Sequence, residues 1–133
     1  YLKGYMYKNF YKVLKVSEWN RLNSSTFIIT DLDKKDGFIH LSLAPQLYIT
    51  LLTYFGTEDR VVLLKLDYLK IQHQIKFEPS IPSGNRGYRF PHFYGDLNRE
   101  VVSKVWYLSR GGFEIPLEVM LEAENAANSD GLM

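Results

Sequence analysis

A short, nearly continuous apolar run in the middle of the chain is the feature that most constrains its fold. Residues 61 to 66 read Val-Val-Leu-Leu-Lys-Leu and lie between the charged residues Arg60 and Asp67. Such a run between charged boundaries is typical of a strand that is buried on both faces. We therefore expect this strand to lie centrally in a sheet.

The segment that precedes this strand has the pattern of an amphipathic helix. Pro45 fits the first turn of a helix and Gly56 fits its end. Between them, five apolar residues recur at the spacing of one helix face: Leu47, Tyr48, Leu51, Leu52 and Phe55. The helical stripe and the apolar strand must cover each other, which predicts these buried residues: Leu47, Leu51, Leu52, Phe55, Val62, Leu64 and Trp106.

The other segments alternate between strand and helix without a strict rhythm. With 133 residues, of which 46% are hydrophobic, the chain can bury one ordinary core. We predict a single α+β domain over residues 1–110, with helices packed on a mostly antiparallel or mixed sheet, and an extension over 111–133 that is helical and then frayed. The expected elements are an opening strand at 7–16, a short helix after Ser17, a charged loop at 31–37, strands around His40 and at 75–78, and a short helix running into a last strand at 101–108.

Charge and composition exclude several classes of protein. The 16 basic and 15 acidic side chains give a net charge of +1 and are interspersed along the chain, which argues against a dedicated nucleic-acid binder. The chain has no cysteine, so it has neither disulfides nor thiolate metal sites. No apolar run approaches the roughly 20 residues of a membrane helix. We expect a soluble, cytoplasmic protein.

His40 is the first candidate for chemistry. It belongs to the segment Asp36-Gly37-Phe38-Ile39-His40-Leu41-Ser42, and a histidine in an apolar strand is costly unless its ring nitrogens find partners. It lies where a strand ends and a helix begins, which suits an acid–base or substrate-binding group. A core histidine bonded to a backbone carbonyl is the alternative. Ser42 shares its strand face and either binds the same ligand or caps the next helix.

The second candidate group is Phe90-Pro91-His92-Phe93-Tyr94-Gly95. His92 and Tyr94 share one strand face, and Gly95 permits a turn or the close approach of a ligand. We predict that His40, His92 and Tyr94 are catalytic and that the two imidazole rings lie on facing strands within a ligand's length, in one cleft with Tyr94. The alternative is that the apolar neighbours fold this segment into the core.

Three charged residues are candidates for binding the ligand together with Ser42. Arg86 and Arg89 lie in or beside a glycine-bearing loop, where a guanidinium can hold a phosphate or carboxylate. The alternative for each arginine is that it is an ordinary charge in contact with solvent. Glu78, just before Pro79, is a candidate carboxylate, with a surface residue or an arginine partner as the alternative.

The common catalytic and metal-binding signatures are absent from the sequence. The three histidines, His40, His73 and His92, do not have the spacing of metal ligands, and no cysteine can assist them, so no metal site is predicted. The chain also lacks glycine-rich nucleotide loops, the nucleophile elbow and the zinc-protease motif.

Several motifs in order give the chain a family resemblance over about residues 7 to 108. The sequence resembles the small bacterial proteins of domain-of-unknown-function family 952 in these segments: Tyr11-Lys12-Val13-Leu14 with Glu18-Trp19, Asp36 to Ser42 with Ala44 and Gln46, Phe77-Glu78-Pro79, and Phe90 to Leu97. That resemblance implies a fold like the ADP-ribosyltransferase superfamily, with a split, curved sheet and a cleft between its halves. The nearest look-alike in that superfamily is tRNA 2'-phosphotransferase, whose His-Val-His-Leu-Ser strand resembles residues 38 to 42 and implies that His40 lies near an NAD cleft.

Three functional hypotheses follow from these residues and this resemblance. The first is an ADP-ribosyltransferase-like enzyme that acts on NAD, the one cofactor implied, or on a phosphorylated nucleotide-like ligand. The second is a non-catalytic module of the same fold that binds a small molecule or nucleotide. The third is a protein-interaction domain, based on exposed aromatic side chains at Tyr1, Tyr5, Tyr7 and Tyr11.

Overall fold

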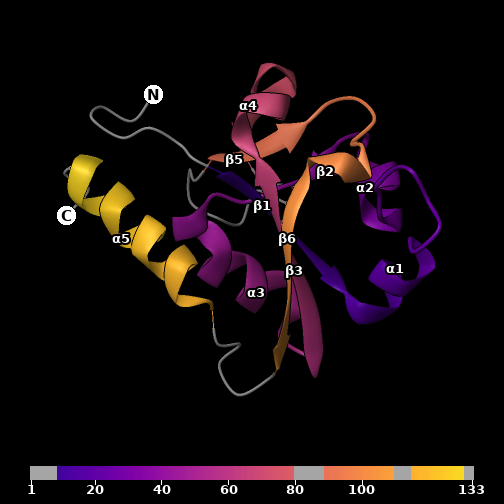
Figure 1. Ribbon diagram of the computed structural model, residues 1–133, viewed down its shortest axis with the longest axis horizontal. Helices are drawn as coiled ribbons and strands as arrows, with labels where there is room; N and C mark the ends of the chain where they lie inside the picture. The colour runs from indigo at the N-terminus through magenta and orange to yellow at the C-terminus, as the bar shows by residue number, and fades with distance from the viewer. Residues whose placement is uncertain (1–8, 80–88, 110–114, 131–133) are drawn as a thin grey trace.

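The computed structural model describes residues 9–79, 89–109 and 115–130, which form an α+β arrangement (Figure 1). No helix in these three ranges combines the length and the apolar character needed to cross a membrane. The helices and 3-10 turns are α1 (Val16–Arg21), α2 (Asp31–Asp36), η1 (Ala44–Gln46), α3 (Leu47–Phe55), α4 (Tyr68–Ile71), η2 (Gln72–Gln74), η3 (Arg99–Val101) and α5 (Leu117–Asp130).

The first sheet is antiparallel and has the apolar strand at its centre. Strand β3 (Arg60–Asp67) lies between β1 (Asn9–Lys15) and β6 (Val102–Ser109). In register, Leu63 of β3 pairs with Val13 on one side and Trp106 on the other. The predicted central position of this strand is therefore confirmed.

The second sheet is also antiparallel and is joined to the first. Strand β5 (Arg89–Phe93) lies between the two-residue strand β2 (Ile39–His40) and β4 (Ile75–Pro79). Just after β2, Ser42 and Tyr11 of β1 exchange two backbone hydrogen bonds of 2.8 Å, so the chain passes from one sheet to the edge of the other. Both sheets are antiparallel, and neither is mixed.

Alternate residues of β1 and β3 pack into two separate apolar clusters, one on each face of the first sheet. One cluster faces the second sheet, and the other faces α3 and α5, which lie on the opposite side of the first sheet from α1 and α2 (Figure 1). This is why an almost continuous apolar run was needed in β3: both of its faces are covered. The first cluster includes Phe10, Leu14, Val62, Leu64, Leu66, Ile39 and Phe93, and the second includes Tyr11, Val13, Val61, Leu63, Leu47, Leu51 and Val119.

Helix α3 buries a narrower stripe than its sequence predicts. Leu47 and Leu51 are buried, as are Val62 and Leu64 of β3, which confirms those four predictions. The prediction for Leu52 is wrong, because this side chain is 60% exposed. Successive helical residues point about 100° apart, so a surface helix with Leu51 inside turns Leu52 toward solvent.

Three further side chains depart from their predicted burial. Phe55 and Trp106 are half-buried rather than buried, and both pack against the edge of the second cluster; Trp106 lies on β6, an edge strand. Tyr11 is only 1% exposed, so it does not contribute to an aromatic surface; its hydroxyl donates a 2.7 Å hydrogen bond to the carboxylate of Glu122 on α5. Tyr1, Tyr5 and Tyr7 lie outside the described residues.

Residues 31 to 37, predicted as a charged loop, form helix α2 instead. The hydroxyl of Thr30 accepts a hydrogen bond from the amide of Asp33, and the carboxylate of Asp33 accepts one from the amide of Thr30. This reciprocal capping box starts the helix, and Gly37, with a φ of 83°, ends it. The spacing of threonine and aspartate was the signal for a helix.

The helix predicted within residues 101 to 108 is also wrong. Only Arg99–Val101 form a turn of 3-10 helix, which begins where the side chain of Asn98 accepts a hydrogen bond from the amide of Glu100. From Val102 onward the chain is strand β6, paired with β3 along its length. The valine and aromatic residues of this segment favour a strand once β3 offers an edge to pair with.

We expect Leu51→Ala to lower the free energy of unfolding by about 2 to 5 kcal/mol, because it leaves a cavity in the cluster between α3 and the first sheet. Leu52→Ala, one residue along the same helix and exposed, is the matched control and should change it by less than about 0.5 kcal/mol. Urea unfolding measures both variants. Equal losses for the two would contradict this packing.

Candidate functional site

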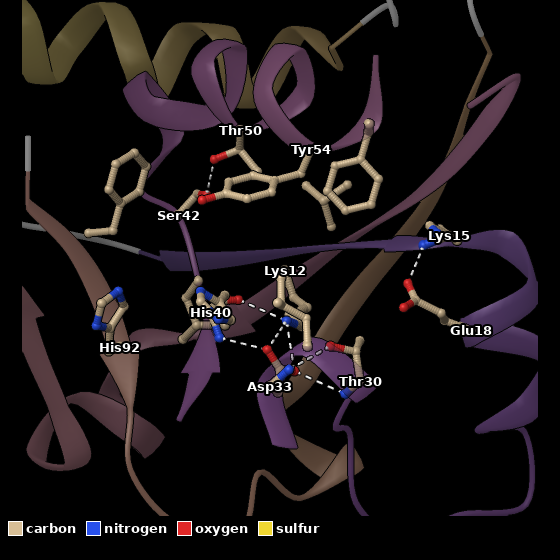
Figure 2. Close-up of a pocket in the computed structure, with 15 residues that line it drawn as sticks. Lys12, Lys15, Glu18, Thr30, Asp33, His40, Ser42, Thr50, Tyr54 and His92 are labelled. Atoms are coloured by element: carbon tan, nitrogen blue, oxygen red, sulfur yellow. Dashed lines mark hydrogen bonds and ion pairs between the residues drawn. The ribbon is translucent and has the colours of Figure 1, made fainter. Parts of the chain in front are cut away.

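A pocket of about 210 Å³ lies between helix α3 and the place where β1 meets β2. Thr50, Tyr54 and Phe55 of α3 line one wall, and Figure 2 shows Thr50 and Tyr54 extending from the helix toward the strands. The opposite wall includes Lys12 of β1, together with His40 and His92. The pocket therefore collects side chains from elements that are distant in sequence, among them β1, β2, α3 and β5.

His40 and His92 lie directly opposite each other on neighbouring strands. They are register partners in the antiparallel pair of β2 and β5, and their ring centroids are 5.7 Å apart. Phe38 packs against both rings, stacked on His92 at 3.9 Å and tilted against His40 at 4.6 Å. The sequence-based expectation that the two rings lie on facing strands and share one pocket agrees with this geometry.

A carboxylate fixes one ring nitrogen of His40. Nε2 lies 2.8 Å from Oδ2 of Asp36, the last residue of α2. A carboxylate oxygen accepts, so this pair places the proton of a neutral imidazole on Nε2 and leaves a lone pair on Nδ1. Among the residues that the structure describes, none bonds to Nδ1.

His92 has the same arrangement with its ring nitrogens exchanged. Nδ1 lies 2.8 Å from Oε1 of Glu78, and the hydroxyl of Tyr94 donates a 2.7 Å hydrogen bond to the same oxygen. The hydrogen bonds from Tyr94 and His92 lower the pKa of Glu78, whereas the bond to Glu78 raises the pKa of Tyr94. Glu78 is thus an ionised acceptor at neutral pH. Nε2 of His92 has no bonded partner within the described ranges.

Behind His40 lies a buried ion pair. Nζ of Lys12 is 2.9 Å from Oδ2 and 3.1 Å from Oδ1 of Asp33, and both side chains are almost fully buried. The same ammonium donates to the backbone carbonyl of His40 at 3.0 Å, and the carboxylate accepts from the backbone amide of His40 at 3.0 Å. Figure 2 shows this cluster directly beside the His40 ring.

The ion pair and the burial set the protonation of the site. Burial alone raises the pKa of Asp33, but the charge of Lys12 and the hydrogen bonds from His40, Thr30 and Lys12 outweigh it, so the pKa is lowered. Burial, followed by the charge of Lys12, lowers the pKa of His40 below its ordinary value, although Asp33 and Asp36 act in the opposite direction. His40 is therefore neutral at pH 7.

The remaining predicted site residues lie at different distances from this centre. Ser42 lines the pocket, and its hydroxyl is 2.7 Å from that of Thr50. The N-cap of the helical turn that follows, η1, is Leu43, so Ser42 is not its cap. Glu78 and Tyr94 contact the site through His92 and are not on the pocket wall, so the predicted place of Tyr94 inside the cleft is wrong.

Of the two arginines predicted to bind the ligand, Arg89 does not line the pocket. Arg89 is exposed, and its backbone carbonyl accepts a 2.7 Å hydrogen bond from Gln46. Arg86 lies outside the described residues. Their roles stay predictions.

Sequence reasoning missed Lys12, Asp33 and Asp36. Lys12 was part of a strand pattern in which it falls between Phe10 and Leu14, on a face that is otherwise apolar. A lysine in such a position requires a buried partner, which is the signal that was available. In the described part of the chain, no group of three or more histidine, aspartate or glutamate side chains could hold a metal ion.

Comparisons with known proteins place the chain among uncharacterised relatives. The sequence profile of the family described as "Protein of unknown function (DUF952)" matches residues 13–105. The crystal structure of protein CC0527 from Caulobacter crescentus is 28% identical, with a TM-score of 0.70 over 86% of this chain and 98% of that one. Its solution NMR structure is 32% identical, with a TM-score of 0.62 over 76% and 84%. No curated protein matches the chain.

We expect Lys12→Met to lower the free energy of unfolding by about 3 to 5 kcal/mol, because it leaves the carboxylate of Asp33 buried without its partner. Adding Asp33→Asn should recover part of this loss, since the amide is uncharged and can still accept from His40. Lys15→Met, an exposed change on the same strand, is the control. Denaturant unfolding tests the set, and a double variant no more stable than Lys12→Met would contradict the ion-pair account.

Proposed function

We propose that this chain, which belongs to the DUF952 family of proteins of unknown function, is an enzyme that transfers protons on a nucleotide-like ligand through His40 and His92. One observation carries the proposal: two imidazoles on one pocket wall each have one nitrogen bonded to a carboxylate and the other without a bonded partner among the described residues. Carboxylates that orient imidazoles in this way are a recurrent device of general acid–base catalysis.

The surroundings of the two rings support different roles. His40 is neutral at pH 7 and Nδ1 carries its lone pair, so His40 is the proposed base that takes a proton from a ligand hydroxyl or from water. His92 faces the ionised Glu78, which stabilises the positive charge of a protonated imidazole. His92 is the proposed acid that donates a proton to the leaving group. Solvent then removes the proton from His40 and returns one to His92.

The pocket suits the ring-bearing part of a nucleotide better than a whole dinucleotide. Its volume of about 210 Å³ is below the ~300–1,000 Å³ of sites that enclose a drug-sized ligand. Tyr54, Phe55 and Phe90 on its wall offer aromatic faces for stacking on a base or nicotinamide. The resemblance to ADP-ribosyltransferases makes NAD, together with phosphorylated nucleotides, the first class of ligand to test.

The two ligand classes place different demands on His92. A phosphoester releases an alkoxide, which requires a proton from an acid as it leaves. Nicotinamide leaves NAD as a neutral molecule and requires none. A strong dependence of turnover on His92 therefore favours the phosphoester, whereas dependence on His40 alone favours NAD.

A non-catalytic binding module is the second candidate function. It is favoured by the pairing of Lys12 with Asp33, which neutralises a cation on the pocket wall that a phosphoryl-transfer site would use. In this alternative, the same ligands bind in the pocket and are released unchanged.

We expect calorimetry with NAD, ADP-ribose and AMP to detect binding, and product analysis to detect turnover of at least one of them. His40→Gln should lower that turnover by about a hundredfold to ten-thousandfold, the usual contribution of a general base. His73→Gln, which alters the exposed third histidine in η2, is the matched control and should leave it unchanged. Binding without turnover would replace the enzyme by the binding module, and no binding at millimolar ligand would remove both.

A further inference from the structure

We propose that Lys12 is a positioning residue that holds His40 in place and keeps it in the neutral, proton-accepting form. This inference rests on the proposed function, because it explains why His40 is able to act as the general base. Lys12 is buried on β1, and its ammonium lies beside the backbone of the residue that it is proposed to control.

The hydrogen bonds of Lys12 leave its ammonium no free donor for a ligand. A lysine ammonium has three donors, and Nζ has three oxygen partners within 3.1 Å: both carboxylate oxygens of Asp33 and the carbonyl of His40. A ligand oxygen could bind Lys12 only by displacing one of them. The role of Lys12 is therefore exercised through His40.

The ion pair also holds both backbone polar groups of His40. The carbonyl accepts from Lys12 and the amide donates to Asp33, at 3.0 Å each. Strand β2 has only two residues, so its ladder gives His40 little support of its own. Because the pair binds both the amide and the carbonyl of His40, it fixes the position of the His40 backbone. It thereby sets the distance between the His40 ring and His92.

The charge of Lys12 acts on the ring as well as on the backbone. The charged and titratable groups that face His40 are Lys12 from β1, Asp33 and Asp36 from α2, and His92 from β5. After burial, Lys12 is the largest influence that lowers the pKa of His40, and the two aspartates oppose it. Removing Lys12 and removing Asp33 should therefore shift the pKa in opposite directions.

NMR titration of the histidine rings in the ligand-free protein tests this directly. In the wild type, His40 should titrate below the value of about 6.5 for an unperturbed histidine. Lys12→Met should raise its pKa, and Asp33→Asn should lower it. Lys15→Met removes an exposed positive charge from the same strand; Lys15 lines the same pocket but is not among the groups that act on His40, so this variant is the matched control, with no change expected.

Several results would overturn the proposal. The first is a wild-type His40 that titrates at or above 6.5. The second is that the variants at Lys12 and Asp33 shift the pKa of His40 in the same direction, which is the result expected if both only loosen the fold. The amide spectrum reports whether each variant is folded; if Lys12→Met is not, the wild type and Asp33→Asn decide. Because no ligand is added, absence of turnover with every nucleotide would contradict the proposed function and leave this measurement intact.

Discussion

The structure depends most on one buried ion pair, between Lys12 and Asp33. Burying two charges costs free energy that their attraction offsets only when every remaining donor and acceptor is also satisfied. Here that condition is met by three elements at once: β1 supplies the lysine, α2 supplies the aspartate through a capping box, and β2 supplies the amide and carbonyl of His40. The pair thereby links the first sheet to the strand that carries the first histidine.

From this linkage the asymmetry of the site follows. Both rings bond to a carboxylate, but His40 also lies beside the Lys12–Asp33 pair, whereas the carboxylate that binds His92, Glu78, accepts a second hydrogen bond from the hydroxyl of Tyr94. Two chemically identical rings, 5.7 Å apart on paired strands, are thus given different surroundings. Opposed surroundings are how proteins obtain an acid and a base from the same kind of side chain.

The sequence predicted those parts of the fold that depend on local pattern. Hydrophobic periodicity, together with the proline and glycine residues at the ends of elements, predicts three features: the strand β3, the helix after Pro45 and the strand position of His40. What it missed depends on tertiary partners. Lys12 was only one residue of an expected strand, because its partner Asp33 comes from a segment that was expected to be a loop. Leu52 belonged to an apolar stripe wider than the face that α3 buries. The expectation that His40 and His92 lie on facing strands agrees with the structure, but the register that makes them direct partners has no signature in either segment alone.

The central claim is that each histidine has one ring nitrogen held by a carboxylate and the other directed to one pocket, and the tautomers test it most directly. Long-range proton–nitrogen NMR spectra of the ligand-free protein near neutral pH distinguish the two ring nitrogens. The account predicts opposite tautomers, with the proton on Nε2 in His40 and, in neutral His92, on Nδ1. The same tautomer in both rings, or a His40 protonated on both nitrogens at that pH, would contradict it.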